Sequence, residues 1–182
     1  MSELCIYHGK RSGFVGDRLY PLNTLKKILP EVYEREVRKY RGREWLLDVS
    51  IPGMDALWND VLHFSLVHPY VIFRKLADAG FDFRNLGFTW IEIPMKALPA
   101  LPSLLYLNTR IWQESRTLLP SDLEPVRPER VRELSGMPEA NMLYYRECKA
   151  KGEHPVFWKR APHLFLKGAL EISSFRTFDW RE

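Results

Sequence analysis

Prolines and glycines divide this chain into short segments, and this limits the length of every helix and strand in it. The 182 residues include 13 prolines and 10 glycines. Proline begins or interrupts a helix, and glycine often follows its last turn. No apolar stretch approaches the roughly 18 residues that a membrane-spanning helix needs. The chain is therefore expected to form short elements around one core, as a single domain over residues 1–182.

Apolar residues at helical spacing predict three short helices. The predicted helices span residues 21–29, 31–40 and 69–79, with one or two further turns in 129–136. Asn23 is the candidate N-cap of the first helix, and Gly80 follows the third. Residues 142–152 fit either a helix or a strand.

Short runs of strand-forming residues make up the rest of the predicted core. The predicted strands span residues 4–8, 60–65, 88–94, 103–108, 154–158 and 169–175. Strands 88–94 and 103–108 are candidates to pair as neighbours. Because helices and strands do not alternate strictly along the chain, the sequence predicts an α+β fold rather than a doubly wound sheet.

Charge and cysteine content permit an anionic partner and favour a reducing compartment. The net charge is +4 and the pI is about 9.1, which is compatible with a nucleic acid or a dinucleotide partner without requiring one. Cys5 and Cys148 are too few for a disulfide framework. The first ten residues contain Glu3 and no long apolar run, so a secretory signal is not expected. We expect a cytoplasmic protein with no membrane segment.

Familiar catalytic motifs are missing from this sequence. It contains no serine-hydrolase elbow, P-loop, paired CxxC, HExxH or Rossmann fingerprint. Asp60, His63 and His68 are candidate metal ligands, but their spacing is not that of a zinc helix, and in a strand Asp60 and His63 point to opposite faces. A metal-dependent hydrolase is therefore a minor alternative, and we expect no metal.

The first candidate site is Tyr7-His8-Gly9-Lys10, where the first predicted strand ends. One interpretation is a half-buried histidine before a turn glycine, since lone histidines are weak signals. In the functional interpretation, Gly9 lets a ligand approach the backbone, whose N–H and C=O pair with a planar amide. His8 then hydrogen-bonds a sugar hydroxyl.

A second candidate site is the basic run that surrounds the end of the second predicted helix. Its cations are Arg35, Arg38, Lys39, Arg41 and Arg43, interleaved with Tyr40 and Trp45. Cations contact phosphates, and bases stack on aromatic rings. Four nearby glutamates nearly balance the charge, so a solvated helix face is the alternative. Arg41 and Arg43 lie beyond the helix, beside Gly42. At this position a guanidinium that donates two hydrogen bonds to a diphosphate is favoured.

These segments, in this order, resemble the ADP-ribosyltransferase superfamily, whose members often open with a strand that ends His-Gly-Thr or His-x-Thr. The chain has Lys10 in place of the hydroxyl residue. The resemblance is nearest to DNA-modifying toxins of the DarT kind, which carry an Asp-Tyr-Val-Pro-Phe-Tyr-Phe segment and then a Ser-Pro that opens a helix. Residues 59–73, NDVLHFSLVHPYVIF, correspond to this segment through Val61, Phe64 and Pro69. Members of the family also have a glutamate near the start of a late strand. Residues 153–172 resemble this segment, with Glu153 two positions before the apolar run.

The resemblance implies a split central antiparallel sheet flanked by helices, and an enzyme that passes ADP-ribose from NAD, its substrate, to an acceptor. Gly9 and His8, with Tyr7 and Lys10 beside them, would hold NAD. Glu153 would be the catalytic carboxylate, with Glu147 as the alternative. From its position and charge, Arg43 is assigned to the diphosphate or acceptor side.

Nucleic acid is the expected acceptor, with DNA ahead of RNA and protein also open. Arg38, Lys39 and Arg41 are the residues expected to bind it. A toxin of this kind would need an antitoxin or immunity protein. The main alternative is a non-catalytic nucleic-acid-binding module on the same kind of fold.

Overall fold

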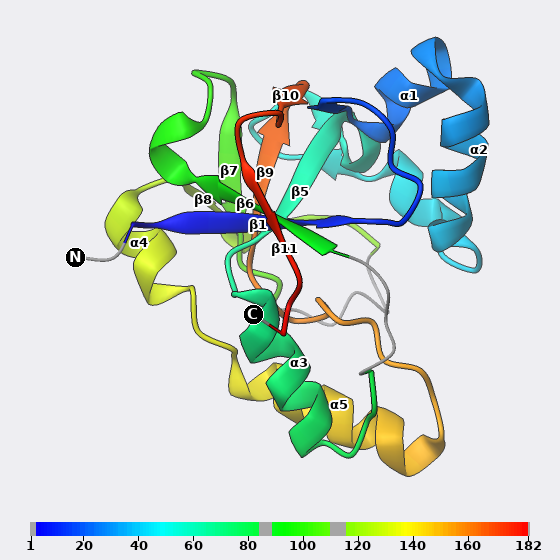
Figure 1. Cartoon of the computed structure of the whole chain (residues 1–182), viewed down its shortest axis with the longest axis vertical. Helices are drawn as coiled ribbons and strands as arrows, with labels where there is room; N and C mark the ends of the chain where they lie inside the picture. The colour runs from blue at the N-terminus through cyan, green and yellow to red at the C-terminus, as the bar shows by residue number, and fades with distance from the viewer. Residues whose placement is uncertain (1–2, 84–88, 110–115, 182) are drawn as a thin grey trace.

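The computed structural model describes residues 3–83, 89–109 and 116–181, and in this part of the chain a seven-stranded antiparallel sheet forms the centre (Figure 1). The strand order is β11-β6-β1-β5-β9-β7-β8. These strands are β1 Cys5–Lys10, β5 Val61–Ser65, β6 Thr89–Pro94, β7 Ser103–Tyr106, β8 Leu123–Pro125, β9 His163–Lys167 and β11 Arg176–Phe178. Two small ribbons pair β2 Arg18–Leu19 with β10 Leu170–Glu171, and β3 Ser50–Ile51 with β4 Ala56–Leu57. The α+β prediction is confirmed.

The large sheet consists of two parts that meet at one residue pair. β1 pairs with β6 from Cys5 opposite Pro94 to Lys10 opposite Thr89. In the described part of the chain, β1 pairs with β5 at Tyr7 opposite Ser65 alone. Figure 1 shows β1 running horizontally while β5 and β9 run steeply across it. The ends of β1 are therefore free of β5, and His8 lies one residue beyond the junction.

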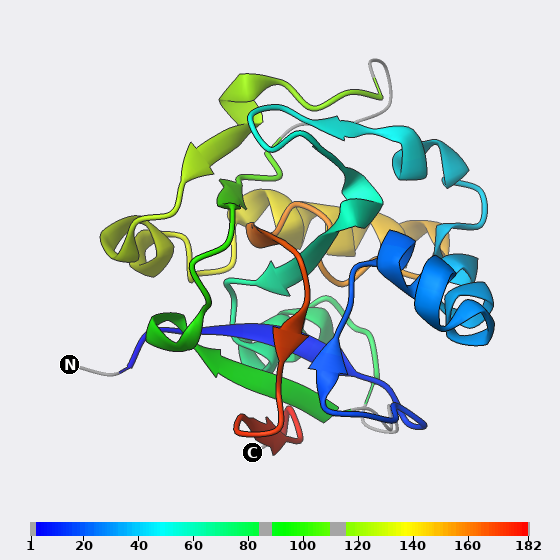
Figure 2. The ribbon, with the colours of Figure 1, turned by 90° about the horizontal axis from the view of Figure 1, so that it is seen from above.

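Helices cover the sheet in two groups. The α-helices are α1 Leu22–Ile28, α2 Pro30–Val37, α3 Pro69–Asp78, α4 Pro128–Glu133 and α5 Glu139–Lys151. The short 3-10 turns are η1 Arg38–Tyr40, η2 Glu44–Asp48, η3 Trp58–Asp60, η4 Met95–Ala97 and η5 Pro120–Asp122. α1 packs on α2 and α3 packs on α5, and Figures 1 and 2 place the two pairs on different sides of β1. None of the helices in the described ranges is long and apolar enough to cross a membrane.

Alternation along β1 sends successive side chains into different parts of the core. Ile6 is fully buried with Phe64, Ile91 and Ile93. Tyr7 packs instead into the cluster that α3 and α5 cover. His8 shares the face of Ile6, and its ring lies 5.7 Å from the ring of Phe64. Tyr7 and His8 therefore point to opposite faces of the sheet.

The two C-terminal strand predictions are wrong in different ways. Residues 154–158 form a loop and the start of a turn, in which Phe157 and Trp158 are packed against the α3–α5 cluster. Their apolar character therefore reflects burial and not a strand. Residues 169–175 contain only the two-residue β10. The sequence analysis missed β9, a central strand between β5 and β7.

Three smaller expectations also change. The proposed pairing of strands 88–94 and 103–108 is wrong, because β6 pairs with β1 and β11 while β7 pairs with β9 and β8. Residue 88 lies outside the described residues. The N-cap of α1 is Pro21 rather than Asn23, whose Nδ2 instead donates to Asp60 Oδ1 at 2.7 Å. Residues 142–152, which fit either state, lie in α5 except Gly152, which caps it at φ 69°.

Candidate functional site

His8 presents an unsatisfied ring nitrogen beside the junction of β1 and β5. Its Nδ1 atom is buried and has no hydrogen-bond partner among the described residues. Burial, reinforced by the nearby charge of Lys39, lowers the pKa of His8 to about 4, although a hydrogen bond with the Gly9 backbone acts in the opposite direction. The ring is therefore neutral near pH 7. Leaving a buried nitrogen without a hydrogen-bond partner lowers the stability of the fold. This nitrogen can still form one hydrogen bond.

Lys39 lies near His8, and Arg43 is hydrogen-bonded to the backbone of Lys39. Arg43 Nη2 donates to the backbone oxygen of Lys39 at 2.8 Å, which fixes the loop after η1. The Lys39 ammonium lies 5.4 Å from the centre of the Tyr40 ring. Lys39 is exposed as a residue, yet desolvation lowers the pKa of its ammonium, and the charges of Arg11 and Arg43 act in the same direction. A side chain that folds back over the protein, with its end among other groups, accounts for both observations.

Tyr144 of α5 packs with Tyr7 in the α3–α5 cluster, on the face of β1 opposite to His8. Its hydroxyl accepts a hydrogen bond from the Val156 N–H at 2.8 Å. Burial raises the pKa of Tyr144 to about 12, and the charge of Arg43 counteracts part of that effect. The Lys159 ammonium lies 4.6 Å from the centre of the Tyr144 ring. The turn after α5 thus places a cation beside Tyr144.

Glu36 supplies a carboxylate to the region of His8 and Lys39. Its side chain is 19% exposed and its carboxylate lies 3.9 Å from Arg11 Nε and 3.2 Å from Arg35 Nε. Its negative charge raises the pKa values of His8 and Lys39, against the larger effect of burial. We name His8, Glu36, Lys39 and Arg43 the His8 cluster. Glu36 was expected only as a balancing charge, because the sequence does not show the direction of its side chain.

Glu153 and Glu147 lie on the surface. Glu153 follows Gly152 in the turn that ends α5, and its backbone N–H donates to the Cys148 oxygen at 2.9 Å. Glu147 is exposed on α5. The strand expected after Glu153 does not form, so the argument that placed this carboxylate at a strand edge is lost. In the described ranges no contact joins either carboxylate to His8.

The other predicted site residues fall in different surroundings. Gly9 lies opposite Trp90 of β6. The Lys10 ammonium lies 5.6 Å from the centre of the Phe14 ring, in the loop after β1. Arg38 and Arg41 are exposed on either side of Lys39 and Tyr40. Arg38, Lys39, Arg41 and Arg43 are all exposed as residues, and of these four only Lys39 acts on the pKa of His8.

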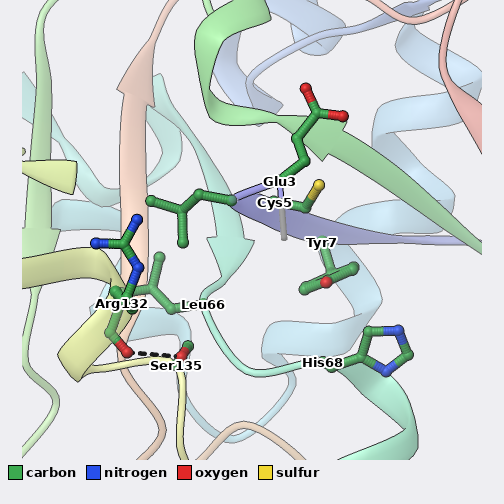
Figure 3. Close-up of a pocket in the computed structure, with 8 residues that line it drawn as sticks. Glu3, Cys5, Tyr7, Leu66, His68, Arg132 and Ser135 are labelled. Atoms are coloured by element: carbon green, nitrogen blue, oxygen red, sulfur yellow. Dashed lines mark hydrogen bonds between the residues drawn. The ribbon is translucent and has the colours of Figure 1, made fainter. Parts of the chain in front are cut away.

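Tyr7, which was expected to contact the cofactor, lines a hollow of about 230 Å³ on the face of β1 opposite to His8. The lining residues are Glu3, Leu4, Cys5, Tyr7, Leu66, His68, Arg132 and Ser135. Figure 3 shows Arg132 and Ser135 on one side of it and Tyr7 and His68 on the other. Burial, followed by the charges of Glu92 and Glu3, raises the pKa of the Cys5 thiol to about 11. This thiol is therefore a poor nucleophile near pH 7.

The three candidate metal ligands have separate partners. Asp60 accepts from Asn23 and from the Leu57 N–H, which closes η3. His63 Nε2 is 2.8 Å from the Trp58 oxygen, and His68 Nδ1 accepts from the Tyr70 N–H at the start of α3. Within the described ranges, no group of three or more His, Cys, Asp or Glu side chains is arranged to hold a metal ion. The structure therefore does not gather Asp60, His63 and His68 into such a group.

Comparison of this chain with protein-family models, with curated proteins and with solved structures finds no match. The case for a function therefore rests on the His8 cluster and on the resemblance of its sequence segments.

Proposed function

We propose that this chain is an NAD-dependent ADP-ribosyltransferase that modifies a nucleic-acid acceptor, DNA before RNA, in a toxin or defence role. The observation that carries the proposal is the buried and unpartnered Nδ1 of His8, whose ring lies near Lys39, with Arg43 hydrogen-bonded to the Lys39 backbone. A neutral imidazole suits a ribose hydroxyl, and the two cations suit a diphosphate. NAD carries both groups within one molecule.

The proposed reaction breaks the bond between the ribose C1′ and the nicotinamide nitrogen. The bonding electron pair leaves with nicotinamide, which departs as a neutral molecule, and C1′ acquires oxocarbenium character. The acceptor then bonds to C1′ and releases its proton. His8 and the Gly9 backbone hold the nicotinamide riboside, and Arg43 holds the diphosphate. A nearby carboxylate stabilises the developing positive charge.

The exposed basic residues support the acceptor side of the proposal. Arg38 and Arg41 face solvent next to the His8 cluster, where they can contact phosphates of a nucleic-acid strand. We place the enzyme in the cytoplasm with an antitoxin or immunity protein as its partner. Both statements follow from the resemblance to DarT-like toxins and from the basic charge.

Calorimetric titration with NAD tests the ligand. We expect the intact chain to bind NAD, and His8→Ala and Arg43→Ala to weaken binding about 10- to 100-fold, as for the loss of a charge-assisted hydrogen bond. His154→Ala is the matched control, since His154 is exposed in the turn after α5. Absence of NAD binding by the intact chain contradicts the proposal.

A second candidate function is a non-catalytic nucleic-acid-binding module, which the exposed Arg38 and Arg41 favour. This module would bind nucleic acid in a salt-dependent manner with no effect of NAD. The same protein sample distinguishes the two functions, because only the transferase consumes NAD when the acceptor is present.

A further inference from the structure

The hollow that Tyr7 lines has room for one small organic molecule. Its volume is about 230 Å³, with Arg132 and Ser135 on one side and Tyr7 and His68 on the other (Figure 3). A water takes up about 30 Å³ of the liquid, so this volume corresponds to about eight waters, or to a ligand of about ten non-hydrogen atoms. We name this cavity the Tyr7 hollow.

Arg132 supplies a positive charge to the Tyr7 hollow. On the same helix, α4, the side chain of Arg130 pairs with two glutamates. Arg132 is exposed, and no carboxylate of the described ranges pairs with it. Glu3, the acidic residue of the lining, lies 2.6 Å from the Lys96 ammonium. The hollow therefore has one cation that the described part of the chain leaves without a counter-charge.

Tyr7 supplies a hydrogen-bond donor on the other side. Its ring packs edge-on against the rings of His68 and Phe178, with 4.8 and 6.2 Å between the centres, and this packing fixes its position. Burial raises the pKa of the Tyr7 hydroxyl, so the group is protonated near pH 7. Among the described residues the hydroxyl has no hydrogen-bond partner, and it can therefore donate to a ligand.

The His68 ring has a supporting role. Figure 3 shows it turned away from Arg132. Its Nδ1 accepts from the Tyr70 N–H at 3.1 Å, which fixes the ring at the start of α3. His68 therefore holds the Tyr7 ring in place, and we assign it no contact with a ligand.

We propose that the Tyr7 hollow binds a small organic acid that has one carboxylate and about ten non-hydrogen atoms. The carboxylate pairs with the Arg132 guanidinium, whose planar fork matches its shape. The apolar body packs on Leu4 and Leu66, the aliphatic residues of the lining. A hydroxyl or carbonyl oxygen at the far end accepts from Tyr7. One cation without a counter-charge favours a monocarboxylate over a phosphate or a dicarboxylate. The inference is independent of the proposed function.

NMR titration with three matched compounds tests this ligand chemistry. The first, para-hydroxybenzoate, has the carboxylate, the apolar body and the distant hydroxyl. We expect it to bind with a Kd of about 1 mM, the usual strength for a ligand of this size. The uncharged para-hydroxybenzamide should bind about 10-fold more weakly, and benzoate, which lacks the hydroxyl, about threefold more weakly.

Variants of the two walls assign each group of the ligand. Arg132→Gln should weaken para-hydroxybenzoate binding about 10-fold and leave the binding of para-hydroxybenzamide unchanged. Tyr7→Phe keeps the ring, and should weaken para-hydroxybenzoate about threefold without affecting benzoate. Arg127→Gln is the matched control, because Arg127 is exposed at the other end of α4 and outside the lining. Circular dichroism and the thermal midpoint establish that each variant is folded.

Two results overturn the proposal. One is an intact chain that binds none of the three compounds at about 10 mM, ten times the expected Kd. The other is an equal effect of Arg132→Gln and Arg127→Gln, since binding would then depend on overall positive charge and not on the hollow. None of these titrations contains NAD, so their outcome and that of the proposed function are separate.

Discussion

Three histidines are held neutral inside this fold, and they should make its stability sensitive to acid. Burial is the first cause in each case and lowers the pKa of His8 to about 4, of His63 to about 3 and of His163 to about 4. In the unfolded chain each ring titrates near its ordinary value of about 6.5. The unfolded state therefore takes up protons first, and stability present above pH 6.5 is lost as the pH falls toward 4.

The size of the loss follows from these shifts. At pH 5 an unfolded histidine gains about 2 kcal/mol from protonation that the buried ring does not gain. Each residue keeps part of its surface exposed, so we expect about 1–2 kcal/mol for each, after allowance for solvent screening. The three together amount to about 3–6 kcal/mol, a large part of the 5–15 kcal/mol typical of a folded domain.

Urea unfolding at pH 7, 6 and 5 measures this loss. The midpoint should fall steeply between pH 6 and 5, and His163→Asn should reduce the fall by about a third. Asparagine can retain the hydrogen bond that His163 Nδ1 makes with the Ala161 oxygen at 2.8 Å, but it does not titrate. His154→Gln, at an exposed position, should leave the pH dependence unchanged. Equal midpoints at pH 7 and pH 5 refute the reasoning.

Three further predictions follow from particular side chains. Asn108→Ala should destabilise the fold by about 2–4 kcal/mol in urea unfolding, because buried Asn108 bonds to the Tyr106 hydroxyl and to two backbone carbonyls; an unchanged midpoint contradicts this. The double variant Arg38→Ala, Arg41→Ala should lower the slope of log K against log salt for single-stranded DNA by about 1–2, and an unchanged slope argues against a role for these cations. Cys5 should react with iodoacetamide at pH 7.5 far more slowly than a free thiol, because burial raises its pKa to about 11; an equal rate rules out a protonated thiol.

Elements with local signals were predictable from the sequence. Pro69 at the first turn and Gly80 after the end define α3, and residues 60–65 and 88–94 contain β5 and β6. β9 was missed because residues 154–158 and 163–167 have the same apolar character. Which of them becomes a strand depends on pairing with β5 and β7, far away in the sequence. Local propensity carries no information about those partners.

The residues of the candidate site could be predicted only in part from the sequence, for a related reason. His8 and Arg43 were candidates because His8-Gly9 follows a predicted strand and Arg43 follows Gly42 beyond a predicted helix. Glu36 did not, because four glutamates flank the basic run and the sequence alone does not show which one turns inward. The direction of a charged side chain is set by how α2 packs, and this depends on the whole fold.

The most direct test of the central claim is mass spectrometry of acceptors after incubation of the purified chain with NAD and, separately, with single-stranded DNA, RNA or bulk protein. The account predicts the addition of one ADP-ribose to DNA, lost in His8→Ala and retained in His154→Ala. No added ADP-ribose on any acceptor, with NAD left intact, contradicts the claim that the His8 cluster is a transferase site.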